Sequence, residues 1–327
     1  MSPSTSLTLR VSAIRAEAKD ILSFELRGLS RLSLPPFLPG AHLEIWLPSD
    51  RDSSGSIVRQ YSICNSPGET DRYVITVGKS PQSRGGSRIM HEGVRVGSIL
   101  TCRGPRNNFV LVNGAAHYSF VAGGIGITPI LSMIRWCESN AKSWSLLYCA
   151  RSRLRAAFCE FLQCFDDRVQ FHFDDEWGGR LANIDAMFSQ PRADEHVYCC
   201  GPGDLMRSVR AATQHYAAGT VHFEWFRPEP DAVSTPTPLD EFDVILRSSG
   251  ARYRVARDRS ILETLEAHGI EIPFSCREGL CRSCEVRLCS GEVDHRDFVL
   301  SEQERALQKS LLVCVSRART SVIEIDI

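Results

Sequence analysis

The sequence of 327 residues lacks an excess of charge of one sign, because 38 basic residues stand against 39 acidic ones. Proteins that bind nucleic acid as their main partner need a basic excess, so this balance argues against nucleic acid. Residues 1–6 lack the charged and apolar parts of a secretory signal peptide. The 13 cysteines are an odd number and too few per residue for a disulfide scaffold. We therefore expect a cytoplasmic protein whose clustered cysteines bind metal.

A membrane-spanning stretch is also lacking, although one uncharged run is long enough to raise the question. This run, residues 107–134, contains three asparagines, four glycines and Pro129. Such residues are typical of a strand, a turn and the start of a helix. We expect no contact with a membrane.

The hydrophobic pattern predicts three domains. Short alternating strands at 7–14, 21–26, 42–47 and 73–77 indicate an antiparallel β-barrel over residues 1–112. Residues 113–228 alternate strands with helices, for example a helix over 156–165, which is typical of an α/β domain with a parallel sheet. Residues 229–239 are rich in proline and small polar residues and are expected to form a linker. Residues 240–327 then form a third, small domain.

The strongest motif lies in this third domain. Cys276, Cys281 and Cys284 are spaced C-x4-C-x2-C, and Cys314 follows in a later segment. This is the ligand spacing of a plant-type [2Fe–2S] cluster. Four thiolates also suit zinc, but zinc sites commonly use paired C-x2-C knuckles and Cys314 has no such neighbour. We therefore favour the cluster over zinc.

The other cysteines carry no metal-binding pattern. Cys289 follows the motif on a predicted strand, and eight more are scattered through the first two domains. We expect these nine thiols to lie in the hydrophobic core. For the adjacent pair Cys199 and Cys200, strand alternation predicts that one is buried and that the other faces a ligand.

Two glycine turns in the middle domain each connect a strand to a helix. The segment FVAGGIGITP contains Gly124, Gly126 and Thr128, and the segment YCCGP ends with Gly201 and Pro202. Backbone amides in such turns approach a pyrophosphate, and neighbouring strand ends of a parallel sheet face one ligand. The first turn departs from G-x-G-x-x-G, so the ordinary dinucleotide fingerprint is not satisfied.

The first domain offers a phosphate site of its own. The strand end RQYS provides Arg59, Tyr61 and Ser62, and the segment SRGGS provides Gly86 and Ser87 at the start of a predicted helix. Arginine with a glycine-serine helix start suits a phosphate group, and the tyrosine ring suits a flat ligand. In a barrel that precedes a nucleotide-binding domain, these residues suggest a flavin.

The motifs RQYS, SRGGS, GGIGITP, CCGP, HFEWF and C-x4-C-x2-C…C, in this order, resemble the phthalate dioxygenase reductase family. Reductases of the vanillate O-demethylase type are similar. The resemblance implies a β-grasp ferredoxin as the third domain, with FMN and NADH as the other cofactors. It assigns Arg59, Tyr61, Ser62, Gly86 and Ser87 to FMN and Gly126, Thr128 and Cys200 to the nicotinamide.

The resemblance also places Phe226 against the flavin ring, as the last residue of HFEWF. Trp225 departs from the small residue expected beside it. The choice between NADH and NADPH stays open at this point, although we favour NADH. Arg151 and Arg153 would suit a 2′-phosphate, whereas Asp174 and Asp175 would suit a free ribose.

The implied function is that of a reductase component. NADH passes a hydride to the flavin, single electrons pass through the [2Fe–2S] cluster, and a Rieske-type oxygenase receives them. No acid–base or nucleophilic group is expected, because the cofactors carry the chemistry. Two alternatives remain: a redox-sensing flavin and iron–sulfur subunit, and an electron-transfer subunit of another dehydrogenase.

Overall fold

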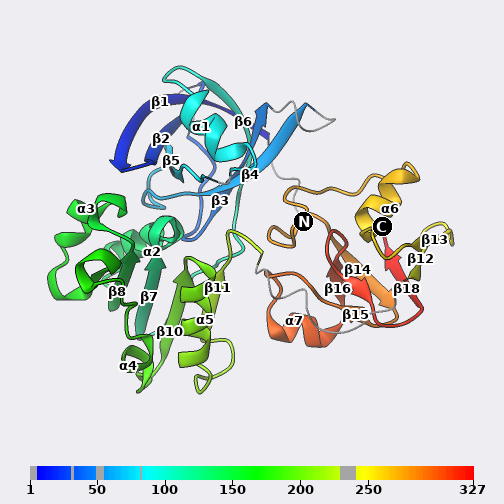
Figure 1. Cartoon of the computed structure of the whole chain (residues 1–327). Coiled ribbons are helices and arrows are strands. Elements are labelled where there is room, and N and C mark those ends of the chain that lie inside the picture. Colours follow the sequence, from blue (N-terminus) through cyan, green and yellow to red (C-terminus); the bar gives the residue numbers. More distant parts are fainter. Residues whose placement is uncertain (1–5, 31–32, 49–54, 82, 229–240) are drawn as a thin grey trace. The chain divides into compact units, whose positions relative to one another are not determined.

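The computed structural model describes residues 6–30, 33–48, 55–81, 83–228 and 241–327 (Figure 1). The predicted linker at 229–239 lies outside the described residues. The chain divides into two units, Met1–Glu224 and Trp225–Ile327. The first unit contains two sheets, an antiparallel one and a parallel one, and the second unit contains a mixed sheet. The three predicted domain boundaries stay a prediction.

The antiparallel sheet confirms the predicted barrel strands. Its order is β4-β3-β6-β1-β2-β5, and an additional bridge joins Ile63 to Ile75. Alternate side chains of the strands point inward, and Val11, Phe24 and Ile45 have no exposed surface. The elements are β1 (Ser6–Ala18), β2 (Ile21–Gly28), β3 (His42–Pro48), β4 (Ser56–Ser62), β5 (Tyr73–Gly78), α1 (Gly86–Glu92) and β6 (Ile99–Arg106).

The second sheet of the first unit is parallel throughout, as the alternation of strands and helices predicts. Its order is β11-β10-β7-β8-β9. After β7 the chain adds β8 and β9 on one side and then β10 and β11 on the other, so the strand order reverses at β7. Ligands of such sheets bind at the carboxyl ends of the strands on either side of the reversal. The strands are β7 (His117–Gly123), β8 (Trp144–Ala150), β9 (Val169–Phe173), β10 (Glu195–Cys200) and β11 (Val221–Glu224).

Helices connect these strands, and one of them is shorter than predicted. The α-helices are α2 (Ile127–Ser139), α3 (Cys159–Gln163), α4 (Ile184–Phe188) and α5 (Gly203–Ala212). The helix expected over 156–165 begins only at Cys159, because Phe158 has a φ of 63°. A left-handed backbone there cannot belong to a right-handed helix. Short 3-10 turns follow three of the strands: η1 (Gly124–Gly126), η2 (Arg153–Arg155) and η4 (Asp174–Trp177).

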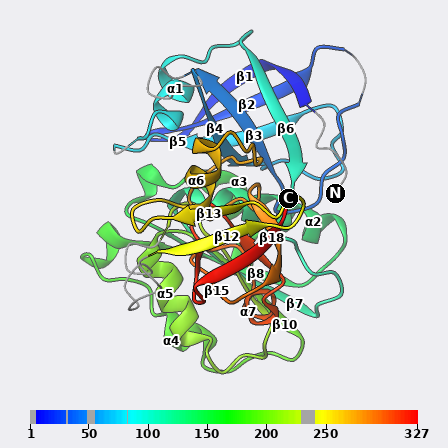
Figure 2. The same ribbon diagram turned by 90° about the vertical axis from the view of Figure 1, so that its right-hand side faces the viewer.

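The second unit is built on a five-stranded sheet of order β13-β12-β18-β14-β16. Strands β12, β13 and β18 lie side by side in Figures 1 and 2. Ser260 and Glu263 form a capping box at the start of α6. The elements are β12 (Phe242–Leu246), β13 (Arg252–Val255), α6 (Ile261–Ala267), β14 (Glu285–Ser290), β15 (Val293–Asp294), α7 (Glu302–Leu307), β16 (Ser310–Leu312), β17 (Arg317–Ala318) and β18 (Val322–Asp326).

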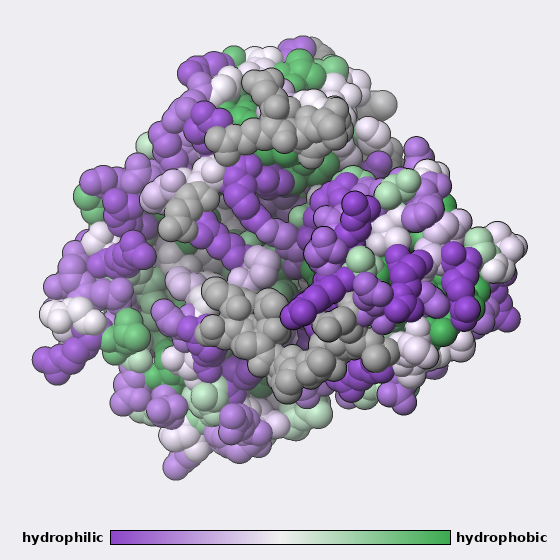
Figure 3. All heavy atoms as spheres, turned by 45° about the vertical axis from the view of Figure 1, so that its right-hand side comes forward, coloured by the Kyte–Doolittle hydropathy of each residue, from purple (hydrophilic) through white to green (hydrophobic). Residues whose placement is uncertain are grey.

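One face of the surface is mostly hydrophilic. On the face shown in Figure 3, hydrophilic side chains predominate and apolar ones gather in small separate groups. Among the described residues, no helix has both the length and the apolar character needed to cross a membrane.

Candidate functional site

The cysteine motif forms a loop that brings its thiols together in the second unit. The Cys276 thiol contacts those of Cys281 and Cys314, and Cys314 also contacts Cys284. Hydrogen bonds between the sulfurs lower the pKa of Cys276 to about 3 and also lower that of Cys284. The same contacts raise the pKa values of Cys281 and Cys314. The four thiols of the motif therefore lie in contact with one another, as the ligands of one metal cluster must.

Backbone amides of the loop point at the sulfurs. The N–H groups of Glu278 and Leu280 donate to Sγ of Cys276 at 3.3 and 3.4 Å, and that of Cys276 donates to Sγ of Cys281 at 3.5 Å. Such bonds stabilise negative charge on thiolates. Four neighbouring thiols, two of which accept hydrogen bonds from backbone amides, fit a [2Fe–2S] cluster whose ligands would be Cys276, Cys281, Cys284 and Cys314.

Gly279 is required at the centre of this loop. Its φ is +72°, and a Cβ there would lie 2.9 Å from Cα of Asp297 and 2.8 Å from the Val315 side chain. The N–H of Phe298 donates to the Gly279 carbonyl at 2.9 Å. The loop is therefore fixed against the segment 297–298 as well as by its cysteines.

The two arginines of the loop are neutralised within the same unit. Arg277 donates to Glu266 at 2.7 and 2.9 Å and lies over the ring of Phe274. Arg282 donates to Glu304 at 2.6 Å. The basic charge that these residues bring to the cluster loop is therefore offset locally.

The two glycine turns of the parallel sheet meet, as predicted from their strands. A Cβ on Gly126 would lie 2.1 Å from the carbonyl oxygen of Cys200, and one on Gly123 would lie 2.5 Å from Pro202. Gly201 in turn packs on the backbone of Gly123. The carboxyl ends of β7 and β10 therefore form one surface that only glycines allow.

The first turn leaves part of its backbone open. Gly124 has a φ of +53° with open space where a side chain would be, so its backbone is accessible to a ligand. The Tyr148 hydroxyl donates to its carbonyl at 3.2 Å. Thr128 is buried, and its hydroxyl donates to the carbonyl of Ile125 at 2.9 Å, so this residue shapes the turn.

The prediction that one cysteine of the adjacent pair faces outward is wrong. Cys199 and Cys200 both have no exposed surface. Cys199 contacts the sulfur of Met206 on α5, and Cys200 lies in the core cluster on the other side of the sheet. Both faces of β10 are covered, so alternation does not bring either thiol to the surface.

The core prediction for the remaining thiols holds only in part. Cys64, Cys102 and Cys137 are buried, as expected. Four others are not: Cys149, Cys159 and Cys289 are half-buried and Cys164 is exposed.

Sequence reasoning missed Glu224, the last residue of β11. It lies beside Cys200 in the strand register, and its Oε2 is buried without a hydrogen-bond partner. Burial raises the pKa of the Glu224 carboxyl to about 8. A neutral carboxyl at the ends of β10 and β11 can donate a hydrogen bond to a ligand there. The strand motif HFEWF contains this residue, but no spacing rule distinguishes it.

The predicted flavin residues of β4 and α1 come together in the barrel. The Arg59 guanidinium donates to the carbonyl oxygens of Val58 and Arg84 at 2.8 and 3.0 Å. Its side chain passes over Gly86, where a Cβ would lie 2.6 Å from Cγ of Arg59. The structure thus places a fixed cation at the start of α1, where a phosphate fits.

The other predicted flavin residues lie on the same two elements, Ser87 on α1 and Tyr61 and Ser62 at the end of β4. The Ser87 hydroxyl accepts from the N–H of Ser80 at 3.2 Å and donates to Ser83 at 3.0 Å. Tyr61 is half-buried and Ser62 is buried at the end of β4. These residues fit a flavin whose phosphate lies near Arg59 and Gly86.

The aromatic pair after β11 belongs to the second unit. Trp225 is buried, and its ring centroid lies 5.8 Å from that of Phe298, so this unit accommodates the large residue. Phe226 is 38% exposed. Its role against the flavin stays a prediction.

Comparisons with known proteins agree with this geometry. Residues 244–319 match the 2Fe-2S iron-sulfur cluster binding domain family. Over nearly its full length, the chain is 39% identical to the phenoxybenzoate dioxygenase subunit beta of Ectopseudomonas oleovorans, covering 98% of this chain and 97% of that protein. A solved structure of phthalate dioxygenase reductase is 38% identical, with a TM-score of 0.70 and 98% of each chain covered. The chain belongs to the phthalate dioxygenase reductase family.

A second solved structure extends the comparison. An intact type IV self-sufficient cytochrome P450 monooxygenase is 36% identical with a TM-score of 0.86. The match covers 98% of this chain but only 41% of that protein. In it, a reductase of this family fold is part of a longer chain.

Family membership establishes the main cofactors and the reaction class. The chain is an oxidoreductase that binds NADH, carries a flavin and holds a [2Fe–2S] cluster. The preference for a cluster over zinc is thereby confirmed.

Proposed function

We propose that this chain supplies electrons from NADH, through FMN and its [2Fe–2S] cluster, to a separate Rieske-type oxygenase. The proposal rests on three sites in one chain, one for each cofactor. They are the Arg59–Gly86 region for the flavin, the contacting glycine turns of β7 and β10 for NADH, and the cysteine loop for the cluster. When bound, the flavin accepts a hydride and releases electrons singly, which no side chain can do.

The protein's part is to bind and orient. The surface formed by Gly123, Gly126 and Gly201 lets a dinucleotide approach the ends of β7 and β10 closely. Glu224, with its raised pKa, is available there as a neutral hydrogen-bond donor. Arg59 neutralises the flavin phosphate. We assign Tyr61, Ser62, Gly86, Ser87, Gly124, Thr128, Cys200, Pro202 and Phe226 to these two sites as well.

FMN is proposed over FAD because the barrel motifs RQYS and SRGGS resemble those of a reductase family whose flavin is FMN. Arg59 and Gly86 account for a single terminal phosphate. Extraction of the flavin and chromatography against both standards tests this choice, and FAD in the extract would contradict it.

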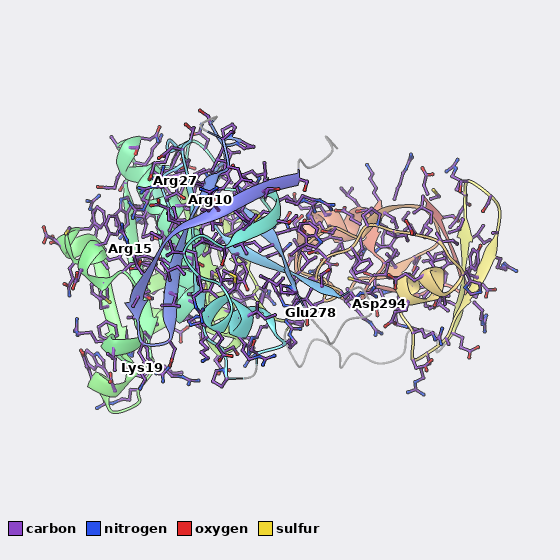
Figure 4. The ribbon with its side chains drawn as sticks, turned by 90° about the horizontal axis from the view of Figure 1, so that it is seen from above. Arg10, Arg15, Lys19, Arg27, Glu278 and Asp294 are labelled. Carbon is purple, nitrogen blue, oxygen red and sulfur yellow. The ribbon has the colours of Figure 1, made fainter. Side chains whose placement is uncertain are left out.

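The partner contact is proposed to involve the cluster loop. From Asp240 onward the chain has 13 basic and 16 acidic residues. Arg277 and Arg282 are paired with Glu266 and Glu304, which cancels one charge of each sign per pair and leaves the acidic excess of three (16 − 13) on other residues. Glu278 of the loop and Asp294 of β15, both labelled in Figure 4, are two of the 16 acidic residues. Electron carriers use small contacts guided by charge, so we expect a basic surface on the oxygenase.

Electron delivery to a purified Rieske oxygenase of aromatic substrates tests the proposal. With NADH present, substrate-dependent oxygen consumption should appear only when both proteins are mixed. Its rate should fall as salt rises from about 0.05 to about 0.5 M, because the Debye length shortens from roughly 14 to roughly 4 Å and charge guidance is screened. Reduction of free quinones or oxygen, with no transfer to any such oxygenase, would contradict it.

A haem monooxygenase is the second candidate acceptor. The match to the self-sufficient cytochrome P450 favours it, because there the same module is joined to a haem protein. Carbon monoxide difference spectra of a P450 mixed with this chain and NADH distinguish the two acceptors.

The proposed compartment is the cytoplasm. All 13 cysteines, each within the described residues, are free of disulfides. A reducing compartment keeps thiols in that state.

A further inference from the structure

The ends of β8 and β9 carry opposite charges at the edge of the sheet where nucleotides bind. Arg151 and Arg153 follow β8, and Asp174, Asp175 and Glu176 follow β9. The two strands pair in parallel register up to Ala150 and Phe173, so both charged segments begin at the same level. In nucleotide-binding sheets of this kind, residues at the strand ends contact either the free 2′-hydroxyl of the adenosine ribose in NADH or the 2′-phosphate in NADPH.

Arg153 is held by two contacts from β9 and η4. Its Nε lies 3.1 Å from Oε1 of Glu176 and its second terminal nitrogen lies 3.4 Å from Oε2, which makes a two-point ion pair. Its guanidinium carbon lies 4.5 Å from the ring centroid of Phe173. Both charged groups are about half exposed, so the pair contributes little to stability. The pair instead limits which ligands Arg153 can bind, because the Glu176 carboxylate already occupies the guanidinium nitrogens that a phosphate would need.

The acidic segment that holds Arg153 is itself fixed to β8. The N–H of Asp175 donates to the carbonyl of Arg151 at 3.2 Å, and the N–H of Gly179 donates to that of Asp174 at 2.7 Å. These two backbone hydrogen bonds fix the position of η4, which carries Glu176. A ligand that needed Arg153 would have to break a formed ion pair and bring phosphate charge close to three acidic residues.

We propose that Glu176 selects NADH over NADPH by pairing with Arg153, whose guanidinium lies over Phe173 at this edge. The inference rests on the NADH-binding function and adds how the chain discriminates against the 2′-phosphate. Its consequence is that Glu176→Gln releases Arg153 to bind the phosphate. Arg153→Gln alone should change little, because that side chain is already engaged.

The test is a double-mutant cycle on the purified holoprotein. Calorimetry measures the Kd of adenosine 2′,5′-bisphosphate and of AMP for the wild type, E176Q, R153Q and the double variant. E176Q should bind the bisphosphate about tenfold more tightly, equivalent to one recovered charged contact of about 1.4 kcal/mol. AMP should bind all four proteins within about twofold. The double variant should lose the gain, because the Arg153 guanidinium that E176Q releases is then absent.

Kinetics give the second readout. With ferricyanide as acceptor, E176Q should lower the KM for NADPH about tenfold and leave kcat unchanged, as expected for uniform binding. The matched control is E138Q, which alters the comparable ion pair of Glu138 with Arg168 on another part of the same domain. That variant should leave the ratio of NADH to NADPH use unchanged.

The proposal would be overturned by E176Q binding the bisphosphate no better than the wild type, or by the double variant keeping the gain. Either result leaves NADH oxidation by the wild type intact, so the selection alone would be wrong. A wild type that oxidises no NADH would instead contradict the underlying function.

Discussion

The buried carboxyl of Glu224 predicts a specific dependence of stability on pH. Burial raises its pKa from 4.5 to about 8 in the folded protein. Between these values the unfolded chain has lost this proton while the folded chain retains it. The folded state then binds one more proton, so the free energy of unfolding falls as pH rises through this window. Replacing the carboxyl by an amide, in Glu224→Gln, removes this dependence.

The magnitude follows from the width of the window. Each pH unit corresponds to about 1.4 kcal/mol. From pH 5 to pH 8 the wild type should therefore lose about 4 kcal/mol relative to E224Q. The first unit spans Met1–Glu224, and for domains of this size 1 kcal/mol corresponds to about 2–4 °C in Tm. The difference in Tm between the two proteins should change by about 10 °C across this range.

Release of flavin fluorescence on heating measures the Tm of the flavin-binding unit at each pH. The amide itself affects stability, but that effect is the same at every pH and cancels in the comparison. The matched control is E160Q, because Glu160 is an exposed carboxyl on α3 of the same unit. Parallel Tm profiles for the wild type and E224Q from pH 5 to 8 would refute the reasoning.

Three further substitutions test the separate sites. Gly126→Ala places a methyl group against the Cys200 carbonyl, so the KM for NADH should rise about tenfold, as steady-state kinetics would show, while flavin content stays unchanged. Arg59→Gln removes a charged phosphate contact, so flavin should bind about 10- to 100-fold more weakly in an equilibrium dialysis. Cys281→Ser should abolish the cluster absorbance and cytochrome c reduction but spare ferricyanide reduction; equal loss of both activities would contradict separable modules.

Local patterns predict the cluster site well. The spacing of Cys276, Cys281 and Cys284 lies within nine residues, so the chain itself limits how far apart the thiols can be. Gly279 sits between them at the positive φ that the loop needs. The amides that point at Cys276 follow from the same local turn.

The nicotinamide site is predictable only in part, since it depends on contacts between distant segments. The glycine turns indicate that β7 and β10 end at one ligand, and Gly126 does pack on Cys200. Burial of both cysteines could not be predicted, because alternation assumes one open face and this sheet is covered on both. Glu224 lies on a strand whose residues are all half-buried, so no pattern in β11 marks its carboxyl as buried.

Backbone conformation explains the remaining difference in the fold. The helix predicted over 156–165 reflects good helix-forming residues, but Phe158 takes a left-handed conformation that no propensity scale anticipates. Similarly, the sequence shows Arg153 and Glu176 as separate charges. Only the parallel pairing of β8 with β9 brings them into contact.

An anaerobic titration of the purified protein with NADH, followed by visible absorbance, tests the central claim most directly. The flavin is extracted and identified beforehand. If electrons pass from NADH through the flavin to the cluster, the flavin and cluster bands should both bleach, with FMN in the extract. Bleaching of the flavin alone, with the cluster still oxidised after excess NADH, would contradict the proposed path and favour a redox-sensing role.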